Sequence, residues 1–467
     1  MFVNFAAEKA FPTLLPALLA CLFWFFPAPQ LHAADRPLFT GEFQHISGVT
    51  TNAPHDYYPA VQRLTLSFEE RFSDGQFHVS GNIRNYFASS PDSLDLFIPE
   101  LWVEFWFSRG DLRFGRQDFR WGLTPVNSLF EFLRPRDLRN FVIEPDRAAV
   151  RGNIAISYRY YAGSSTFEMV FSPVLTPNIL PDPGKRWFID VPAPAGLPLR
   201  ISGNHDNQNS FNGQPPELQA GLMWQIDVSP SLEIQLSAFQ WVPPMPTFEK
   251  QFLFTETADP VPSPAISLEP SYQPSIVLGG GSSYQTRSGF ILTAEAMWYH
   301  RKQFDRIPTI LLGFDPADTS LQELARIAQV IENEKDGFIS VHQAFQSLAE
   351  LRYTRGLLTT GIQWFWERVL SPQPDIVQKE RFHRISGFVS RDIFRQRLSS
   401  SLLVTFHPAG DDYWVNTEHQ YDFTDNVNLG IGAHFFGGPS PDESYGHLSF
   451  GSYKKNSLLY GSLSFFW

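Results

Sequence analysis

The stretch from Asp111 to Gly122 reads DLRFGRQDFRWG, and a second alternating segment, VRGNIAISYRYY, runs from Val150 to Tyr161. Between them lie two Arg-rich pieces, FLRPRDLR from Phe132 to Arg139 and EPDR from Glu144 to Arg147. From Arg109 to Arg159 there are ten Arg, no Lys and six acids, although the whole chain carries a net charge of -12. Two alternating strands that flank an Arg-rich loop indicate a lined passage rather than a packed core. We therefore predict a transmembrane β-barrel whose interior is organised around this loop.

The composition agrees with a single barrel. A chain of 467 residues ordinarily forms two or three domains, but alternating segments punctuated by turns continue from about residue 38 to the end. The slightly negative mean hydropathy of -0.19 excludes a helical membrane protein. Aromatic residues make up 15% of the chain, which suits the lipid face and interfacial girdles of an outer-membrane barrel, although a soluble sandwich array can also be rich in them.

The charge and the cysteine count exclude several classes of function. The acidic balance of -12 argues against nucleic-acid binding as the main task. The only cysteine is Cys21, so a processed chain has none, which excludes disulfide frameworks and Cys-ligated metal sites. We expect no cofactor and no bound metal.

Residues 1–34 have the features of an export signal, with an apolar run and small residues for cleavage near Ala33 or Ala34. The barrel then occupies 35–467. The piece Leu18–Cys21 resembles a lipoprotein box, so acylation of Cys21 is an alternative, although the apolar run continues beyond the cysteine where a lipoprotein turns polar.

Alternation with period two is clearest from Val61 to Phe87, where apolar and polar residues alternate on both sides of a Ser73-Asp74-Gly75 turn. A half-buried sheet in a soluble sandwich would show the same local pattern. The arrangement of the whole chain favours the barrel, because short turns alternate with long connections at about 121–149, 174–216, 243–272, 302–346 and 371–383. We expect about 18 strands, with about 16 as the alternative, and assign the weak segment Ser444–Lys454 to the last loop.

Two irregular features need separate predictions. The 302–346 connection has apolar residues at helical spacing, followed from Glu332 by a faint calcium-loop pattern that lacks the terminal Glu; a Gly-terminated helix is the preferred interpretation.

In the strand Leu112–Gly122, strict alternation would direct three charged residues into lipid. These residues are Arg116, Asp118 and Arg120. A bulge at Gly115 would turn all three inward and would turn Phe119 and Trp121 outward.

The chain ends in an amphipathic segment, Leu458–Trp467, with one apolar face made by Leu459, Leu463, Phe465 and Trp467. A final strand that ends in an aromatic residue is what outer-membrane barrels present to their assembly machinery. We expect that machinery, and outer-membrane lipid, as partners.

The run Gly115-Arg116-Gln117…Trp121-Gly122, with Arg134–Arg139 after it, resembles a group of largely uncharacterised porin-like outer-membrane proteins of Gram-negative bacteria. Tyr421–Leu429 and the end of the chain, with Gly437-Gly438-Pro439 and Asn456, are similar to the same group. The Gly-Arg-Gln element is also similar to alginate-export porins. The resemblance covers about a quarter of the chain. It implies an envelope channel or a structural barrel and no catalytic residues.

The leading functional prediction is a passive or weakly selective channel for small polar or anionic solutes. The expected lining has arginines on one side, Arg113, Arg116, Arg120, Arg134, Arg136 and Arg139, and acidic counter-charges, Glu100, Glu104, Asp118 and Asp137. The alternative for these arginines is that they pair with acids and brace the wall and loop. The alternative for the whole barrel is a scaffold that sheathes an envelope partner, as in a porin–cytochrome conduit or an export complex. An enzyme is not expected, because no Gly-x-Ser-x-Gly or His-Glu-x-x-His motif is present.

Overall fold

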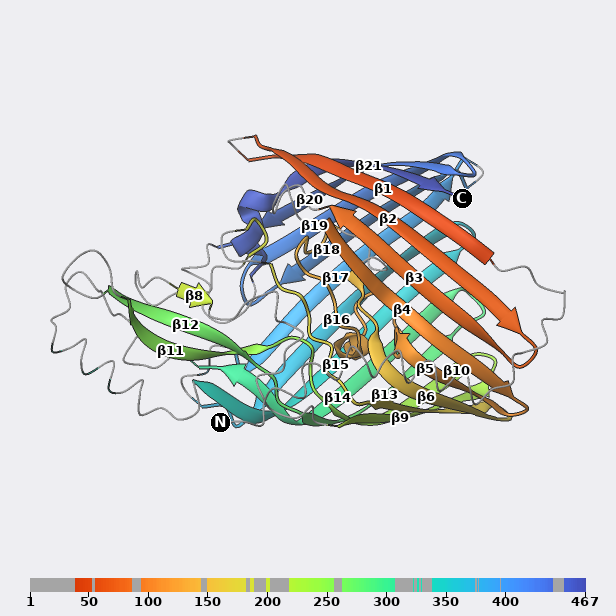
Figure 1. Ribbon diagram of the computed structural model, residues 1–467, viewed down its shortest axis with the longest axis horizontal. Helices are drawn as coiled ribbons and strands as arrows, with labels where there is room; N and C mark the ends of the chain where they lie inside the picture. The colour runs from red at the N-terminus through yellow and green to blue at the C-terminus, as the bar shows by residue number, and fades with distance from the viewer. Residues whose placement is uncertain are drawn as a thin grey trace, which may run out of the picture.

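Eighteen alternating segments form one wall in the computed structural model (Figure 1). The structure describes residues 38–52, 55–85, 94–143, 149–181, 185–188, 199–201, 218–255, 263–306, 322, 326, 329, 338–373, 376, 378–394, 396–439 and 449–467. The predicted export signal and Cys21 lie outside the described residues. The wall strands are β1 (Leu38–Thr50), β2 (Tyr57–Phe72), β3 (Gly75–Asn85), β4 (Leu94–Phe107), β5 (Gly110–Gln117), β6 (Asn153–Ala162), β7 (Ser165–Ser172), β9 (Gln219–Ser229), β10 (Leu232–Trp241), β13 (Ser275–Gln285), β14 (Phe290–Asp305), β15 (Ile339–Arg355), β16 (Leu358–Leu370), β17 (Arg381–Ile393), β18 (Leu398–His407), β19 (Asp412–Thr424), β20 (Val427–Gly437) and β21 (Leu458–Phe466).

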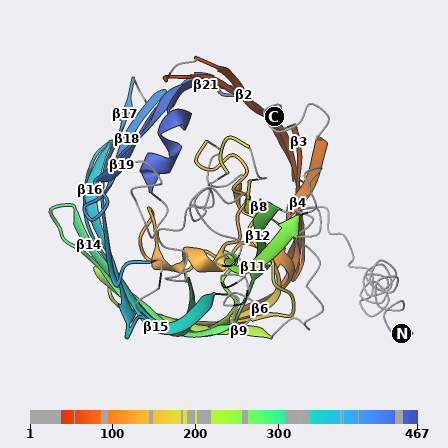
Figure 2. The same cartoon turned by 90° about the vertical axis from the view of Figure 1, so that its left-hand side faces the viewer.

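The wall closes into a ring (Figure 2). Each strand is antiparallel to its neighbours, and β21 pairs with β1, so that Glu42 lies opposite Phe466 and Thr50 opposite Leu458. Closure leaves no unpaired edge in the wall. The predicted antiparallel barrel of 18 strands is confirmed, and the described part of the segment 444–454 belongs to a 3₁₀ helix, η5 (Phe450–Asn456), in the last connection.

All long connections lie at one end of the ring, as predicted, and that end also carries the short β18–β19 connection, 408–411. One end, called the turn end, has only turns of two to four residues, such as 73–74 and 286–289, and also carries the outer ends of β1 and β21. Every longer connection lies at the other end, called the loop end. An even number of strands with both terminal strands starting or ending at the turn end is the arrangement of outer-membrane barrels.

A second, small sheet lies at the loop end beside the ring (Figure 1). It consists of β11 (Thr247–Thr255), antiparallel to β12 (Ser263–Ser271), and β8 (Leu199–Ile201), parallel to β12. The sequence predicts only a long connection at 243–272. Pro264 and Pro270 lie within β12, and prolines of this kind argue against a strand when only the sequence is read.

In the part of the chain that the structure describes, helical structure is limited to the connections. No helix among the described residues is long and apolar enough to cross a membrane. In the 306–338 connection Gln322, Arg326 and Gln329 are helical, as predicted there, and the rest of that predicted helix lies outside the described residues. Gln343, the last position of the faint calcium-loop pattern, lies in β15 opposite Leu370.

The two faces of the wall differ in polarity. Apolar side chains remain exposed on the outer face, for example Leu94 (72%) and Ile431 (65%). Charged side chains such as Arg84 and Glu295 point inward and are buried. A soluble sandwich would bury its apolar face, whereas a barrel in a lipid bilayer presents that face to lipid.

The bulge predicted at Gly115 is wrong. β5 keeps an unbroken register with both neighbours, with Gly115 opposite Trp102 of β4 and Ala155 of β6. Gly115 instead has a φ of +122°, and a Cβ atom there would lie 2.1 Å from the Leu101 carbonyl oxygen, so only glycine fits. The irregularity is in β4, where the four residues from Phe97 to Glu100 lie opposite only three residues of β3, Ser80 to Asn82.

The predicted orientation of two aromatic residues is also wrong. Phe119 and Trp121, expected to face lipid, are only 4% and 7% exposed and belong to an apolar cluster inside the ring. The rings of Trp121 and Phe239 are 4.9 Å apart. The reason is that β5 ends at Gln117 and the chain then leaves the wall, so alternation no longer decides which way these side chains point.

Candidate functional site

The connection between β5 and β6, residues 118–152 and here called the luminal loop, folds into the ring (Figure 2). Its first part contains a 3₁₀ helix, η1 (Leu129–Leu133), which packs on inward residues of β10 and β13–β16. Its later part, with Phe141 and Ile143, packs with Trp187, Tyr453 and Phe436 near β20, β21, β1 and β2. These are opposite stretches of the ring. The loop therefore crosses the lumen and is held at both sides.

A buried carboxylate of β14 anchors the first part of the loop. Glu295 is 1% exposed and accepts hydrogen bonds from the backbone N–H groups of Leu123 (2.7 Å) and Leu129 (2.8 Å). The N–H of Thr124 (3.0 Å) and the hydroxyl of Ser128 (3.0 Å) also donate to it. Ser128 in turn caps η1, since its hydroxyl accepts from the N–H of Phe130 at 3.1 Å. One side chain thus satisfies three backbone donors in the first part of the loop.

Asp118 joins the beginning of the loop to its middle. Arg134 donates to both carboxylate oxygens of Asp118, from Nε at 2.9 Å and from Nη2 at 3.1 Å. Arg120 donates to the same carboxylate at 2.8 Å. Glu131 accepts from Arg134 at 3.2 Å and from Arg136 at 2.7 Å. The bidentate geometry fixes the fold of this part of the loop.

Asp137 joins the loop to the wall. Arg84 of β3 donates to it at 3.0 Å, and Arg139 at 2.6 Å; Arg139 also reaches Asp95 of β4 at 2.5 Å. Burial raises the pKa of the Asp137 carboxyl, but the hydrogen bonds and charge of Arg139 and the charge of Arg84 lower it further, so the net pKa lies below the ordinary 3.8. Asp137 is therefore ionised at neutral pH.

Arg113 and Glu104 form a separate pair on the luminal face of β5 and β4. Arg113 donates to Glu104 from Nε at 3.0 Å and from Nη2 at 2.7 Å. Its guanidinium carbon lies 4.1 Å from the centre of the Trp102 ring. Both bonds go to Oε1 of Glu104, and together with the stacking on Trp102 they hold this charge in a fixed place on the wall.

Three further guanidinium groups surround Phe97. The guanidinium carbons of Arg84, Arg116 and Arg151 lie 5.4, 5.8 and 5.3 Å from the ring centre. Within the described part of the chain, Arg116 and Arg151 form no ion pair, although Arg151 donates to the Pro177 carbonyl at 2.9 Å. Burial lowers the pKa of Arg151 to about 10, because the charges of Asp137 and Asp95 do not offset the loss of water and the other arginines nearby. These two cations are the uncompensated charges of the site.

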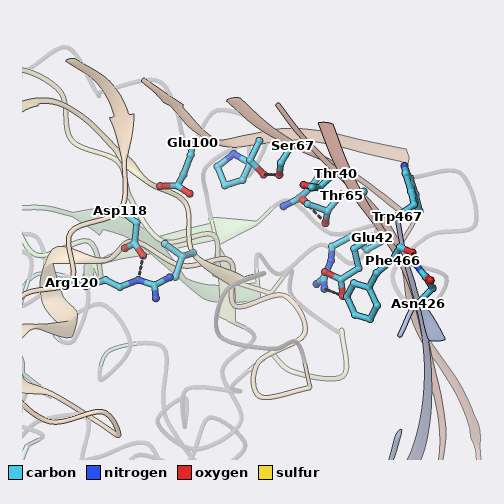
Figure 3. A pocket seen from close by; sticks show the side chains of 16 residues that line it. Thr40, Glu42, Thr65, Ser67, Glu100, Asp118, Arg120, Asn426, Phe466 and Trp467 are labelled. Atoms are coloured by element: carbon cyan, nitrogen blue, oxygen red, sulfur yellow. Dashed lines mark hydrogen bonds and ion pairs between the residues drawn. The ribbon is translucent and has the colours of Figure 1, made fainter. Parts of the chain in front are cut away.

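Two chambers that share Asp118 and Arg120 in their lining lie towards the turn end. One of about 490 Å³ is lined by Glu100, Asp118, Arg120 and polar side chains of β1–β3 (Figure 3). The other, of about 530 Å³, is lined by Asp118, Arg120, Arg113 and polar residues of β6–β10. The side chain of Arg120 is 70% exposed, so its charge faces the open part of the lumen in both chambers.

The ten residues predicted to line the pore divide into two sets. Arg134 and Asp137 are 7% and 4% exposed, and with Arg136 and Arg139 they form ion pairs within the loop or between loop and wall. Arg113, Arg120, Asp118 and Glu100 line the chambers, Glu104 holds Arg113, and Arg116 lies at the Phe97 ring. Most members of the set are thus either in ion pairs of the loop or in the lining of a chamber, and Asp118 and Arg120 are in both.

Several residues of the site were not predicted: Glu295, Arg84, Arg151 and Phe97. A signal was present for Glu295 and Arg84, because each is a charged residue at an inward position of a predicted strand. For Arg151 and Phe97 the sequence holds no comparable signal. Among the described residues no group of three or more potential metal ligands comes together.

Similarity to solved structures concerns the fold. OccAB2 of Acinetobacter baumannii aligns over 93% of this chain and 98% of its own, with 9% identity and a TM-score of 0.50. OpdL of Pseudomonas aeruginosa aligns over 92% of this chain and 98% of its own, with 9% identity and a TM-score of 0.50. No protein family and no curated protein matches the sequence. The chain is thus a porin-like barrel in fold, and the likeness carries no information about a solute.

Proposed function

We propose that the protein is an outer-membrane channel for small polar solutes, and that anions pass in preference to cations. The observation that carries this proposal is the position of Arg120, an exposed cation between two chambers. The unpaired cations Arg116 and Arg151 at the Phe97 ring add positive charge to the site. The placement in the outer membrane rests on the exposed apolar outer face and on the closed, even-stranded wall.

The charge balance of the described residues around the luminal loop favours anions only slightly. Eight arginines stand against seven acids: Arg84, Arg113, Arg116, Arg120, Arg134, Arg136, Arg139 and Arg151, and Asp95, Glu100, Glu104, Asp118, Glu131, Asp137 and Glu295. In a narrow passage with little water, the remaining positive charge attracts anions over short distances. Around the second chamber the acids Asp111, Glu168 and Glu233 outnumber Arg159 and oppose this attraction, so the preference is weak.

The scaffold alternative receives less support. A barrel that sheathes a partner needs an open lumen, whereas here the chain's own loop crosses the interior and is anchored at both sides. We propose that partners are limited to the surrounding lipid, the assembly machinery that reads the strand ending at Trp467, and envelope proteins at the outer surfaces of the barrel.

The test is single-channel conductance and reversal potential of the purified barrel in a planar bilayer across a salt gradient. We expect a steady conductance whose reversal potential shows anion preference. Arg120→Gln, Arg116→Gln and Arg151→Gln should each shift the reversal potential towards cations. Arg391→Gln is the matched control, because Arg391 is exposed on the outer face at the turn end, opposite Leu358 and Ser400.

Two results would contradict the proposal in different ways. A barrel that never conducts removes the channel. A channel with unchanged reversal potential in all three variants keeps the channel and removes the arginines as its selectivity elements.

A further inference from the structure

We infer that the outer wall carries a binding site for the phosphate of an anionic lipid, made by Arg368 of β16 and Arg381 of β17 at the loop end. The two arginines are direct cross-strand partners. They face outward, since inward Val369 is 1% exposed while outward Trp364, four residues before Arg368, is 49% exposed. Their side chains are 43% and 63% exposed.

The protein itself neutralises the charges of Arg368 and Arg381 only in part. Like charges directly opposite each other in an antiparallel pair are unfavourable. The acid that the two share is Glu380, at 3.7 Å from Arg368 and 3.8 Å from Arg381, which is longer than a charge-assisted hydrogen bond. Within the described residues neither arginine makes a side-chain hydrogen bond. Lys379, next to Glu380 in the chain, is exposed as well, but its ammonium donates to the Ala409 carbonyl at 2.7 Å. Two guanidinium groups around one carboxylate leave a net positive charge on the outer wall.

Aromatic side chains fix the depth of this pair relative to a membrane. Trp366 lies opposite His383, one outward position nearer the turn end than the arginines, and Trp364 follows at the next outward position. The Trp364 and His383 rings are parallel at 6.0 Å, and Phe345 packs on Trp366 at 5.8 Å. Tryptophan and aromatic residues gather where hydrocarbon meets headgroups. The arginines beyond them are therefore level with the headgroups of the leaflet on the loop side.

The occupant that fits is a lipid phosphate. Guanidinium groups bind phosphate in a bidentate manner, and two of them side by side match the charge of one phosphate monoester better than the shared carboxylate does. This inference rests on the proposed membrane placement, which puts the loop end in the outer leaflet, so the probe is a glycolipid that carries two phosphates (lipid A). The turn end offers a comparison, since Arg391 there faces a leucine and a serine rather than a second arginine.

The experiment measures lipid binding to the purified barrel in detergent by native mass spectrometry, with lipid A, the same lipid without phosphates, and inorganic phosphate. We expect at least about tenfold tighter binding of the phosphorylated lipid, and loss of that difference in Arg368→Gln/Arg381→Gln, whereas Arg391→Gln binds as the unaltered protein does. Glu380→Gln, which removes the competing carboxylate, should bind the phosphorylated lipid more tightly. Binding of inorganic phosphate alone with equal affinity would show that a free anion, not a lipid, is the ligand.

Equal binding of the two lipids by the unaltered protein, or unchanged binding by the double variant, would overturn the inference. If the double variant does not fold, the Glu380→Gln result decides, because no change or a loss of affinity contradicts the site. A negative result for lipid binding can be distinguished from a negative result for the proposed channel function. The pair faces away from the lumen, so the double variant should keep the conductance and reversal potential of the unaltered barrel whether or not the lipid binds.

Discussion

Single buried charges in the lumen act as anchors, and Glu295 shows what one such residue contributes. Glu295→Gln keeps the shape of the side chain but replaces one acceptor oxygen by a donor that faces the N–H groups of the loop. Each buried donor left without an acceptor costs about 1–3 kcal/mol, so the first part of the luminal loop should loosen. We expect larger and noisier single-channel currents, together with faster amide exchange between Leu123 and Leu133.

The control for this change is Glu233→Gln, which also removes a luminal acid. Glu233 accepts from Gln225 at 2.7 Å and, among the described residues, accepts no hydrogen bond from the loop's backbone. If the two variants gave the same currents, the effect would come from the lost charge and not from the anchor.

At the level of elements, the strands were predictable and the luminal loop was predictable only in part. Period-two alternation is a local signal, so almost every wall strand follows from neighbouring residues alone. The path of the loop depends on partners far away in the chain: Leu123 is bound by Glu295, 172 residues later. The same limit explains the error at Phe119 and Trp121, because alternation predicts a face only while the chain remains in the wall.

The loop as an element has a defined response to acid. Because Arg139 and Arg84 hold the pKa of Asp137 below its ordinary 3.8, its ionised form stabilises the docked loop at and above that pH, and this contribution is lost only as the pH falls through the lowered pKa. We expect loop-dependent current fluctuations to stay constant from neutral pH down to about 3.8 and to increase below it. Asp137→Asn should fluctuate at every pH, since the neutral amide never forms the two ion pairs. An onset of fluctuations well above that pH in the unaltered protein would contradict this role of Asp137.

At the scale of the whole molecule, the proposed membrane placement requires the outer face of the wall to contact hydrocarbon. Substitutions at different depths along the wall test this requirement. Ile431 lies midway along β20 and is 65% exposed, and Phe423 lies near the turn end of β19 and is 60% exposed. The two side chains therefore have nearly the same exposure but lie at different depths along the wall. An arginine at the middle of a bilayer costs about 2–4 kcal/mol in a barrel and about 0–1 kcal/mol near the interface. Reversible unfolding from lipid vesicles should therefore show a loss of about 2–4 kcal/mol for Ile431→Arg and at most about 1 kcal/mol for Phe423→Arg.

The same pair of variants separates lipid from water as the outer environment. If the wall faced water, neither arginine would lose hydration. Both variants would then have the same free energy of unfolding as the unaltered protein, in vesicles and in detergent-free buffer. If the wall faced a protein partner, both changes would disrupt contacts of similar size, because the two side chains are equally exposed. Only a hydrocarbon layer of limited thickness makes the cost depend on depth, and it is the layer that also places Arg368 and Arg381 among lipid phosphates at one edge.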